Sequence, residues 1–194
     1  FNFDYIQQAL VFSINHELNH KSQSFEIYES GGPCTLVPLK TKNSNGHCSS
    51  VVLMQKSREI KKTLALDVEE MSEFISKRTG RVLGDCKIIT QVKKFPIISQ
   101  IAKNFIAERV VLIAESAHVM PPIGAQGLNT SIQDIKVLTE FIGHEVAGDK
   151  DFGNKIILTG FEKARANQIR AKMLGVHILN KISMNGSGIA LRIR

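Results

Sequence analysis

The clearest pattern in the chain is a short apolar run followed by a loop and an amphipathic stretch, in residues 108–142. Residues 110–113 are consecutive and apolar, mostly β-branched, which predicts a strand buried on both faces of a parallel sheet. Polar residues and two prolines end this strand. Apolar residues then recur every three to four positions and predict a helix that begins near Asn129 or Thr130. The expected packed face comprises Ile132, Ile135, Leu138 and Ile142, widened by Val137 and Phe141.

The first quarter of the chain has the alternating pattern of half-buried strands. Residues 24–28 alternate apolar and polar positions and residues 5–15 do so imperfectly, and we expect these two segments to pair as a hairpin. Residues 35–39 and 49–54 follow as two further short strands, separated by turn-forming residues. Together they predict an antiparallel sheet.

Helical patterns follow this sheet in residues 57–66 and 67–78. Asp67 stands at an N-cap position with Glu70 three residues later, which is the spacing of a capping box. A strand pattern returns in residues 85–98. The predicted fold class is therefore α+β with an α/β part, in which the antiparallel sheet precedes a parallel strand and its helices.

Composition is that of a folded globular protein. The chain has 194 residues, of which 43% are hydrophobic and 22% charged, and this usage argues against intrinsic disorder. No apolar run reaches the length of a membrane span. The odd number of cysteines and their wide spacing predict reduced thiols in a cytoplasmic protein. They are Cys34, Cys48 and Cys86.

The excess positive charge lies at the C-terminal end. Residues 150–194 contain nine Lys or Arg and two acidic residues, which accounts for the whole net charge of +7. A helix predicted over residues 154–182 has an apolar side with Ile157, Phe161, Ala164, Ala171, Ile178 and Ile182. Its opposite side contains Lys155, Lys163, Arg170 and Lys181. Such a helix either lies on an anionic membrane surface or acidic partner, or packs into the core with a solvated back. We expect no nucleic acid, because aromatic residues do not alternate with the basic ones.

Residues 16–20 read His-Glu-Leu-Asn-His, which matches the H-E-x-x-H pattern of zinc proteases. That pattern works only on a helix, where residues four apart share one face. Strand-like residues precede it, and Asn15, Asn19 and Ser22 are poor helix formers. We therefore expect a strand end and a loop here, and no metal site.

The loop after the apolar run predicts a ligand site. Gly124 and Gly127 permit backbone conformations that a Cβ would disfavour, and the helix that follows directs its N-terminus to the same place. Free N–H groups and the positive end of a helix dipole suit phosphates, carboxylates and electron-rich ring oxygens.

Ala-Glu-Ser-Ala-His at residues 114–118, Pro-Pro-Ile-Gly-Ala-Gln-Gly-Leu-Asn at 121–129, and Asp134 resemble a known motif. It is the second FAD-contacting motif of flavoprotein aromatic hydroxylases, the family of para-hydroxybenzoate hydroxylase. The nearest branch is the ubiquinone-biosynthesis hydroxylases. Because the pattern extends over about twenty positions, it is far more specific than a single glycine triplet.

The resemblance implies FAD as cofactor and NADPH or NADH as reductant. It implies that Glu115 holds a ribityl hydroxyl and that Pro122 and Gly124 lie beside the isoalloxazine ring. Backbone amides at the flavin N1 and O2 edge would come from Gly127, Leu128 and Asn129. No residue is assigned a catalytic role, since the protein groups in this family mostly position and polarise.

The resemblance covers nearly all of the chain but only half of the family fold. No G-x-G-x-x-G turn for the FAD pyrophosphate is present in the 194 residues, so we expect the C-terminal half of a longer protein. The implied domains are a substrate-binding domain in residues 1–104 and the C-terminal part of the FAD domain in residues 105–194. Alone, the chain should self-associate, because its apolar strand would lack neighbours.

The implied activity is hydroxylation of a phenolic ring that bears a polyprenyl tail, in ubiquinone biosynthesis. Two positions depart from the family pattern, because Ala114 stands where the family has glycine and Glu115 where it has aspartate. The alternative is therefore a catalytically degenerate relative that acts as a binding or scaffold component of a biosynthetic assembly.

Overall fold

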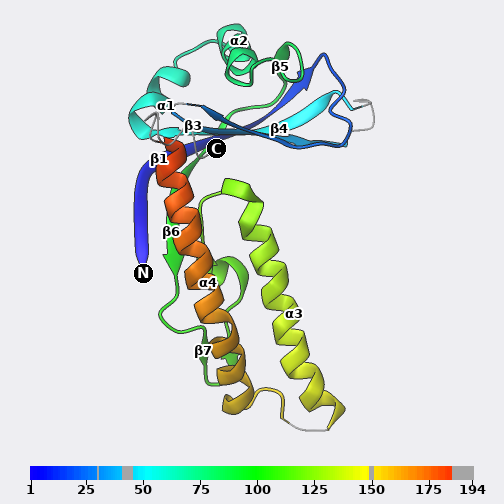
Figure 1. Ribbon diagram of the computed structural model, residues 1–194, viewed down its shortest axis with the longest axis vertical. Helices are drawn as coiled ribbons and strands as arrows, with labels where there is room; N and C mark the ends of the chain where they lie inside the picture. Colours follow the sequence, from blue (N-terminus) through cyan, green and yellow to red (C-terminus); the bar gives the residue numbers. More distant parts are fainter. Residues whose placement is uncertain (30, 41–45, 149–150, 185–194) are drawn as a thin grey trace. The chain divides into compact units, whose positions relative to one another are not determined.

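A computed structural model describes the chain except for residues 30, 41–45, 149–150 and 185–194 (Figure 1). The chain forms two compact units. Unit 1 comprises Phe1–Tyr5 and Ile98–Leu179, and unit 2 comprises Ile6–Ile97 and the chain from Asn180 onward. The domain boundary expected between residues 104 and 105 falls inside unit 1, whose second segment begins at Ile98.

Unit 2 is built on an antiparallel sheet. Its strands are β1 (Asn2–His16) from Ile6 onward, β2 (Phe25–Glu29), β3 (Gly32–Pro38), β4 (Cys48–Lys56) and β5 (Cys86–Ile88). The order is β2-β3-β4-β1, and β5 pairs with the end of β1. Every one of these pairings is antiparallel, as the alternating sequence predicted.

Two helices, α1 (Ser57–Thr63) and α2 (Val68–Arg78), cover one face of this sheet (Figure 1). Alternate strand residues point toward these helices and form a core with them, because successive side chains of a strand face opposite ways. The core includes Leu10, Phe12, Ile14, Leu36, Val51, Leu53, Ile60, Met71 and Ile75. The three cysteines are free and buried.

The capping box predicted for α2 is present. The Asp67 carboxylate accepts a hydrogen bond from Glu70 N at 2.8 Å, and the Glu70 carboxylate accepts one from Asp67 N at 3.1 Å. This satisfies two of the backbone donors that a helix start leaves unpaired.

The predicted hairpin between residues 5–15 and 24–28 is wrong. β2 pairs with β3, and β1 pairs with β4 and β5. Only two positions separate β2 from β3, which is the connection length of a tight hairpin, whereas eight separate β1 from β2. The strand expected over residues 85–98 is also divided. Between β5 and β6 the chain leaves the sheet, and Thr90 Oγ1 accepts a hydrogen bond from Ser13 N at 2.8 Å.

The H-E-x-x-H pattern lies at the end of β1 and in the loop after it, as predicted. His16 Nδ1 donates to the Leu18 carbonyl at 2.8 Å, and its Nε2 lies 3.0 Å from Ser49 Oγ. Burial lowers the pKa of His16, and the neighbouring His20 and His47 lower it further. Both ring nitrogens of His16 are thus engaged by protein atoms.

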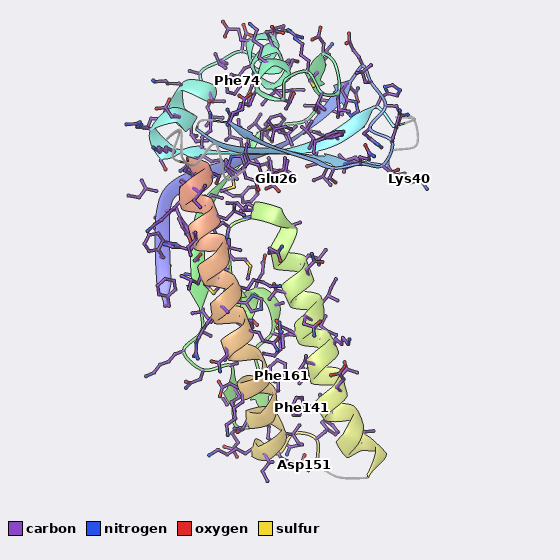
Figure 2. All side chains as sticks on the ribbon, in the orientation of Figure 1. Glu26, Lys40, Phe74, Phe141, Asp151 and Phe161 are labelled. Atoms are coloured by element: carbon purple, nitrogen blue, oxygen red, sulfur yellow. The ribbon has the colours of Figure 1, made fainter. Side chains whose placement is uncertain are left out.

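Unit 1 contains the second half of the chain. Its elements are β6 (Lys93–Ile101) from Ile98 onward, β7 (Ile106–Ala107), β8 (Val110–Val111), η1 (Ala114–Ser116), β9 (His118–Val119), η2 (Ile123–Ala125), α3 (Gln126–Ala147) and α4 (Lys155–Met184) as far as Leu179. α3 and α4 lie side by side (Figure 1), and Figure 2 labels Phe141 and Phe161 on them. A Cβ at Gly160 would lie 2.6 Å from the Phe141 ring, so the two helices approach closely there.

The parallel, fully buried strand expected at residues 110–113 takes a different form. β8 is only two residues long, pairs antiparallel with β7, and leaves Val110 51% exposed. The cause is local. Arg109 has φ 55°, so a two-residue turn folds the chain straight back onto β7. The helix α3 also begins at Gln126, three residues before the expected start.

The buried faces of both long helices differ from the expected ones. On α3, Ile132 and Ile135 are more than half exposed, whereas Thr130 and Asp134 are buried. On α4, Ala171 and Ile178 are exposed. The buried apolar side chains are Leu158, Phe161, Ala166, Ile169, Met173, Val176 and Met184. The four basic residues named above are exposed, as predicted. No helix in the described ranges has the length and apolarity to cross a membrane.

Candidate functional site

The turn after β8 contains Ala114 and the first predicted site residue, Glu115. Ala114 has φ 55°, a left-handed conformation that costs a residue with a Cβ about 1–2 kcal/mol and glycine almost nothing. Ser116 Oγ closes the turn by donating to the Ile113 carbonyl at 2.6 Å and accepting from Ile113 N at 3.2 Å. The backbone therefore explains why a glycine suits the position of Ala114.

A buried carboxylate anchors this turn to α3. Asp134 accepts hydrogen bonds from Ala114 N at 3.0 Å and His118 Nε2 at 2.7 Å. Arg165 Nε donates to its other oxygen at 2.8 Å, and Arg165 Nη2 lies 2.8 Å from the same oxygen in an ion pair. Burial alone would raise the pKa of Asp134, but these hydrogen bonds outweigh it and the pKa lies below its ordinary value. The carboxylate thus joins η1, β9, α3 and α4.

Arg165 is the residue of this cluster that the sequence pattern did not reveal. Its side chain is 3% exposed, and Nη2 also donates to the Thr130 carbonyl at 3.3 Å. A signal was present in the sequence, because Arg165 stands four residues from both Phe161 and Ile169, on the buried side of α4. A charged residue on an apolar face is buried only when it is paired.

Glu115 lies in the turn that Asp134 holds. Its side chain is exposed, and within the described part of the chain no hydrogen bond or ion pair engages it. It lines a cavity of about 240 Å³. The other lining residues are Phe1, Gln100, Ile101, Ala102, Ser116, Ala117 and His118. A carboxylate in this setting can accept a hydrogen bond from a ligand hydroxyl.

The second loop ends at the N-terminus of α3. Pro121 is buried and Pro122 exposed, so the loop is fixed on one side and open on the other. Gly124 has φ 65°, and the helix starts two residues later. The first-turn N–H groups of a helix have no intrahelical partner, and the predicted amides are in this turn. They belong to Gly127, Leu128 and Asn129.

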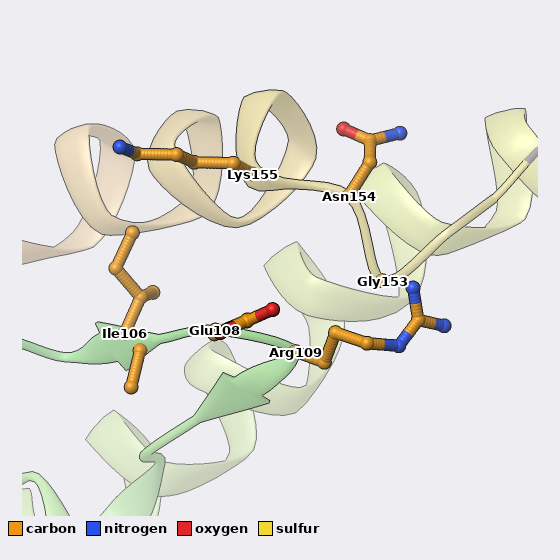
Figure 3. A pocket seen from close by; sticks show the side chains of 7 residues that line it. Ile106, Glu108, Arg109, Gly153, Asn154 and Lys155 are labelled. Carbon is orange, nitrogen blue, oxygen red and sulfur yellow. The ribbon is translucent and has the colours of Figure 1, made fainter.

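The structure links the two loops through Asp134, two turns into α3, which bonds to the residue before Glu115. A different cavity of about 620 Å³ contains none of the predicted residues (Figure 3). The tip of β7–β8 and the start of α4 line it, and Arg109 is paired there with Asp151 at 2.8 Å. In Figure 3 the Lys155 and Arg109 side chains extend in different directions. We therefore place the candidate site at the Glu115 turn and the α3 N-terminus.

Comparison with known proteins identifies the family. A family model described as an FAD binding domain matches residues 4–169. The chain belongs to this FAD-binding family. The match includes the Glu115 turn, both loop glycines and the first fifteen residues of α4, and it confirms the family and the cofactor, FAD, that the motif predicted.

The curated relatives are longer than this chain. The chain is 27% identical to the ubiquinone hydroxylase UbiL of Rhodospirillum rubrum. The matched region covers 83% of this chain and 36% of the relative. It is 22% identical to the ubiquinone hydroxylase UbiM of Neisseria meningitidis, over 98% of this chain and 40% of the relative. It is 30% identical to the mitochondrial ubiquinone biosynthesis monooxygenase COQ6 of Caenorhabditis elegans, over 93% of this chain and 47% of the relative. The chain spans less than half of each relative.

Solved structures show the fold of the chain. PqsL of Pseudomonas aeruginosa, solved in complex with 2-aminobenzoylacetate, superposes with a TM-score of 0.78 at 16% identity, over 98% of this chain and 52% of that one. The anhydrotetracycline hydroxylase OxyS of Streptomyces rimosus gives a TM-score of 0.62 at 15% identity, over 99% of this chain and 37% of that one. The predicted fold class is confirmed. The roles of individual site residues remain predictions.

Proposed function

We propose that the full-length protein containing this chain is an FAD-dependent monooxygenase that hydroxylates a phenolic ring bearing a polyprenyl tail, in ubiquinone biosynthesis. In this reaction one atom of O2 enters the ring as a hydroxyl group and the other leaves as water. NADPH or NADH supplies the two electrons. The relatives named for ubiquinone hydroxylation support this assignment.

In this proposal the described residues form one side of the FAD site. Glu115 would accept a hydrogen bond from a ribityl hydroxyl, and Pro122 and Gly124 would line the ring. The N–H groups of Gly127, Leu128 and Asn129 would hold the N1 and O2 edge. Bound FAD supplies the redox and oxygen chemistry. The chain contributes fixed dipoles that stabilise negative charge at that edge, together with a rigid mount for the cofactor.

The observation that carries the proposal is the contrast between the buried anchor and the free carboxylate beside it. His118 and Arg165 both form hydrogen bonds with the buried Asp134 carboxylate, which also binds Ala114 N. Glu115, next to Ala114 in the same turn, is exposed and has no hydrogen-bond or ion-pair partner among the described residues. A turn held this firmly with an unengaged acid suits a ligand better than a purely structural loop.

Spectroscopy and turnover of the full-length protein test this function. Purified protein should be yellow with bound flavin and should consume NADPH or NADH together with O2 when given a short-chain prenylated phenol. Mass spectrometry with 18O2 should find one labelled oxygen in the product ring. A colourless protein that FAD does not reconstitute, or a product without the label, would contradict the proposal.

The second candidate is a degenerate relative that acts as a scaffold. Ala114 at φ 55° and the longer acid at Glu115 favour it, because both changes weaken a site built for glycine and aspartate. In that case the full-length protein would lack an intact G-x-G-x-x-G turn and bind partner proteins of the assembly without flavin. Reading the sequence that encodes the remainder of the protein separates the two candidates.

We also propose that the protein acts in the cytoplasm and touches a membrane surface from one side. The substrate class would require this contact, because a polyprenyl tail partitions into lipid. The exposed basic residues of α4 favour an anionic surface, or an acidic partner that replaces it. They are Lys155, Lys163, Arg170 and Lys181.

A further inference from the structure

Two cavities open on the same side of α4 in unit 1 and share one residue, Arg170. The first, of about 400 Å³, lies toward the C-terminal end of the helix, and the second, of about 320 Å³, toward its N-terminal end. The helix residues that line them lie between Glu162 and His177. At 1.5 Å per residue this stretch is about 22 Å long. The two cavities therefore follow one another along a single helix face.

The first cavity is apolar where it is open. Ile101, Met173 and Leu174 line it, and Leu174 is 61% exposed. Apart from Arg170, its polar side chains are engaged with one another. The Tyr5 hydroxyl lies 2.9 Å from Ser99 Oγ and 2.9 Å from His177 Nδ1. These groups do not require a polar ligand, so the cavity offers mainly apolar surface.

The second cavity is basic. Lys103, Lys163 and Arg170 line it together with the amides of Asn104 and Asn167. Its one acidic residue, Glu162, accepts a hydrogen bond from Phe105 N at 2.6 Å. Within the described residues no salt bridge involves any of the three basic side chains, so the cavity has a net charge of +2.

We infer that this face of α4 binds one amphiphile with an anionic head group and a single flexible apolar chain. The head lies in the basic cavity and the chain in the apolar cavity, with Arg170 at the junction. Charge complementarity and apolar burial then act on the same molecule. A small anion would use only the basic cavity, and a neutral hydrocarbon only the apolar one.

The chain part of the site is tested with fatty carboxylates of increasing length. Full-length protein is titrated by calorimetry with octanoate, decanoate and dodecanoate, each below its critical micelle concentration. Each buried methylene group should tighten binding about fourfold. Leu174→Gln should weaken dodecanoate binding, whereas Ile156→Gln, at an 82% exposed position of the same helix outside both cavities, should not. Affinity independent of chain length would overturn the inference.

The head part is tested by changing the charge on each side of the contact. Arg170→Gln should weaken dodecanoate binding roughly tenfold to a hundredfold, since it removes a charge-assisted hydrogen bond. Lys181→Gln, on the same helix outside both cavities, should leave it unchanged. Dodecanol, which has the chain without the charge, should be insensitive to Arg170→Gln. Equal effects of Arg170→Gln and Lys181→Gln would instead indicate a diffuse basic surface and refute a defined site.

Vesicles identify the source of the amphiphile. A membrane phospholipid as the natural ligand predicts that phosphatidylglycerol vesicles compete with dodecanoate and phosphatidylcholine vesicles do not. A free fatty acid as ligand predicts dodecanoate binding that neither vesicle displaces. Inorganic phosphate alone should compete only weakly, and full competition by phosphate would refute the role of the chain. Flavin content of all four variants should equal that of wild type, so this test and the test of the hydroxylase fail separately.

Discussion

His118 Nε2 lies 2.7 Å from Asp134 Oδ2, and the two side chains are each about 1% exposed. This contact joins β9 to α3, and the same carboxylate receives Arg165 from α4. Because Asp134 also binds Ala114 N, it fixes the turn that presents Glu115. The geometry of an exposed candidate site thus depends on a carboxylate that is itself buried.

Replacement of this carboxylate should be strongly destabilising. Asp134→Asn keeps the shape of the side chain but leaves Arg165 buried without a counter-charge. Breaking a buried pair in this way costs about 3–5 kcal/mol of unfolding free energy. Urea unfolding followed by circular dichroism measures the loss.

The matched control is Asp151→Asn, which breaks the exposed pair with Arg109. An exposed ion pair is worth at most about 1 kcal/mol, so this variant should unfold near the wild-type midpoint. Equal losses in the two variants would mean that Asp134 is not the anchor described here.

Low pH should destabilise the folded protein because Asp134 becomes protonated. The hydrogen bonds to Asp134 hold its pKa below the ordinary value despite burial, so the unfolded chain takes up this proton first as the pH falls. The free energy of unfolding should therefore decrease below about pH 5, toward the folded pKa. The difference in free energy of unfolding between wild type and Asp134→Asn should decrease over the same pH range. Urea titrations at several pH values test this, and a constant difference would contradict it.

The predicted contact of Glu115 with FAD gives a test on the full-length protein. Glu115→Ala should remove a charge-assisted hydrogen bond of about 1.5–3 kcal/mol and weaken FAD binding roughly tenfold to a hundredfold. Glu115→Asp should bind FAD at least as tightly as wild type, since it restores the reach of the family acid. Fluorescence titration of the apoprotein measures both affinities.

Glu140→Ala, on the exposed surface of α3, controls for the loss of one negative charge and should bind FAD as wild type does. If Glu115→Ala also binds FAD with unchanged affinity, Glu115 does not contact the cofactor.

Two glycines of α4 should respond oppositely to alanine. A Cβ at Gly175 has no neighbour within 4 Å, so Gly175→Ala should stabilise the helix by up to about 1 kcal/mol. A Cβ at Gly160 would displace the Phe141 ring of α3, and Gly160→Ala should cost about 1–3 kcal/mol. Thermal unfolding of both variants tests whether α3 and α4 approach as described. A gain in both would show that they do not.

Local sequence signals predicted the elements with local causes. The Asp67 capping box, the four strands in residues 2–56 and the long helix α4 follow from residues adjacent in the chain. Strand pairing and helix faces were predicted less well, because they depend on distant partners. Asp134 on α3 is buried because Arg165, thirty-one residues later, neutralises it.

The candidate site divides in the same way. The motif indicated Glu115 and the α3 N-terminus, because residue types at fixed spacing define both. Ala114 shows what the sequence left unexplained, since its positive φ gives the reason for the family glycine only once the backbone is known. Arg165 was not identified from the sequence, because its partner Asp134 is thirty-one residues away and no local spacing indicates the pair.

The last prediction concerns the 194-residue chain by itself. Leu128, Ile132 and Ile135 follow one another at helical spacing on α3, and each is more than half exposed. Exposed apolar residues aligned in this way mark a surface that another polypeptide covers. We therefore expect the isolated chain to self-associate and to bind FAD poorly, since the pyrophosphate-binding turn is not among its residues.

Size-exclusion chromatography with light scattering over a range of concentrations measures this self-association. Ile132→Lys should shift the chain toward the monomer, because it places a charge in the middle of the apolar stripe on α3. Ile156→Lys introduces the same charge at the more exposed position on α4 and should leave the mass distribution unchanged. If wild type is monomeric at every concentration and carries stoichiometric FAD, the stripe is not a contact surface. The 194 residues would then suffice for the cofactor.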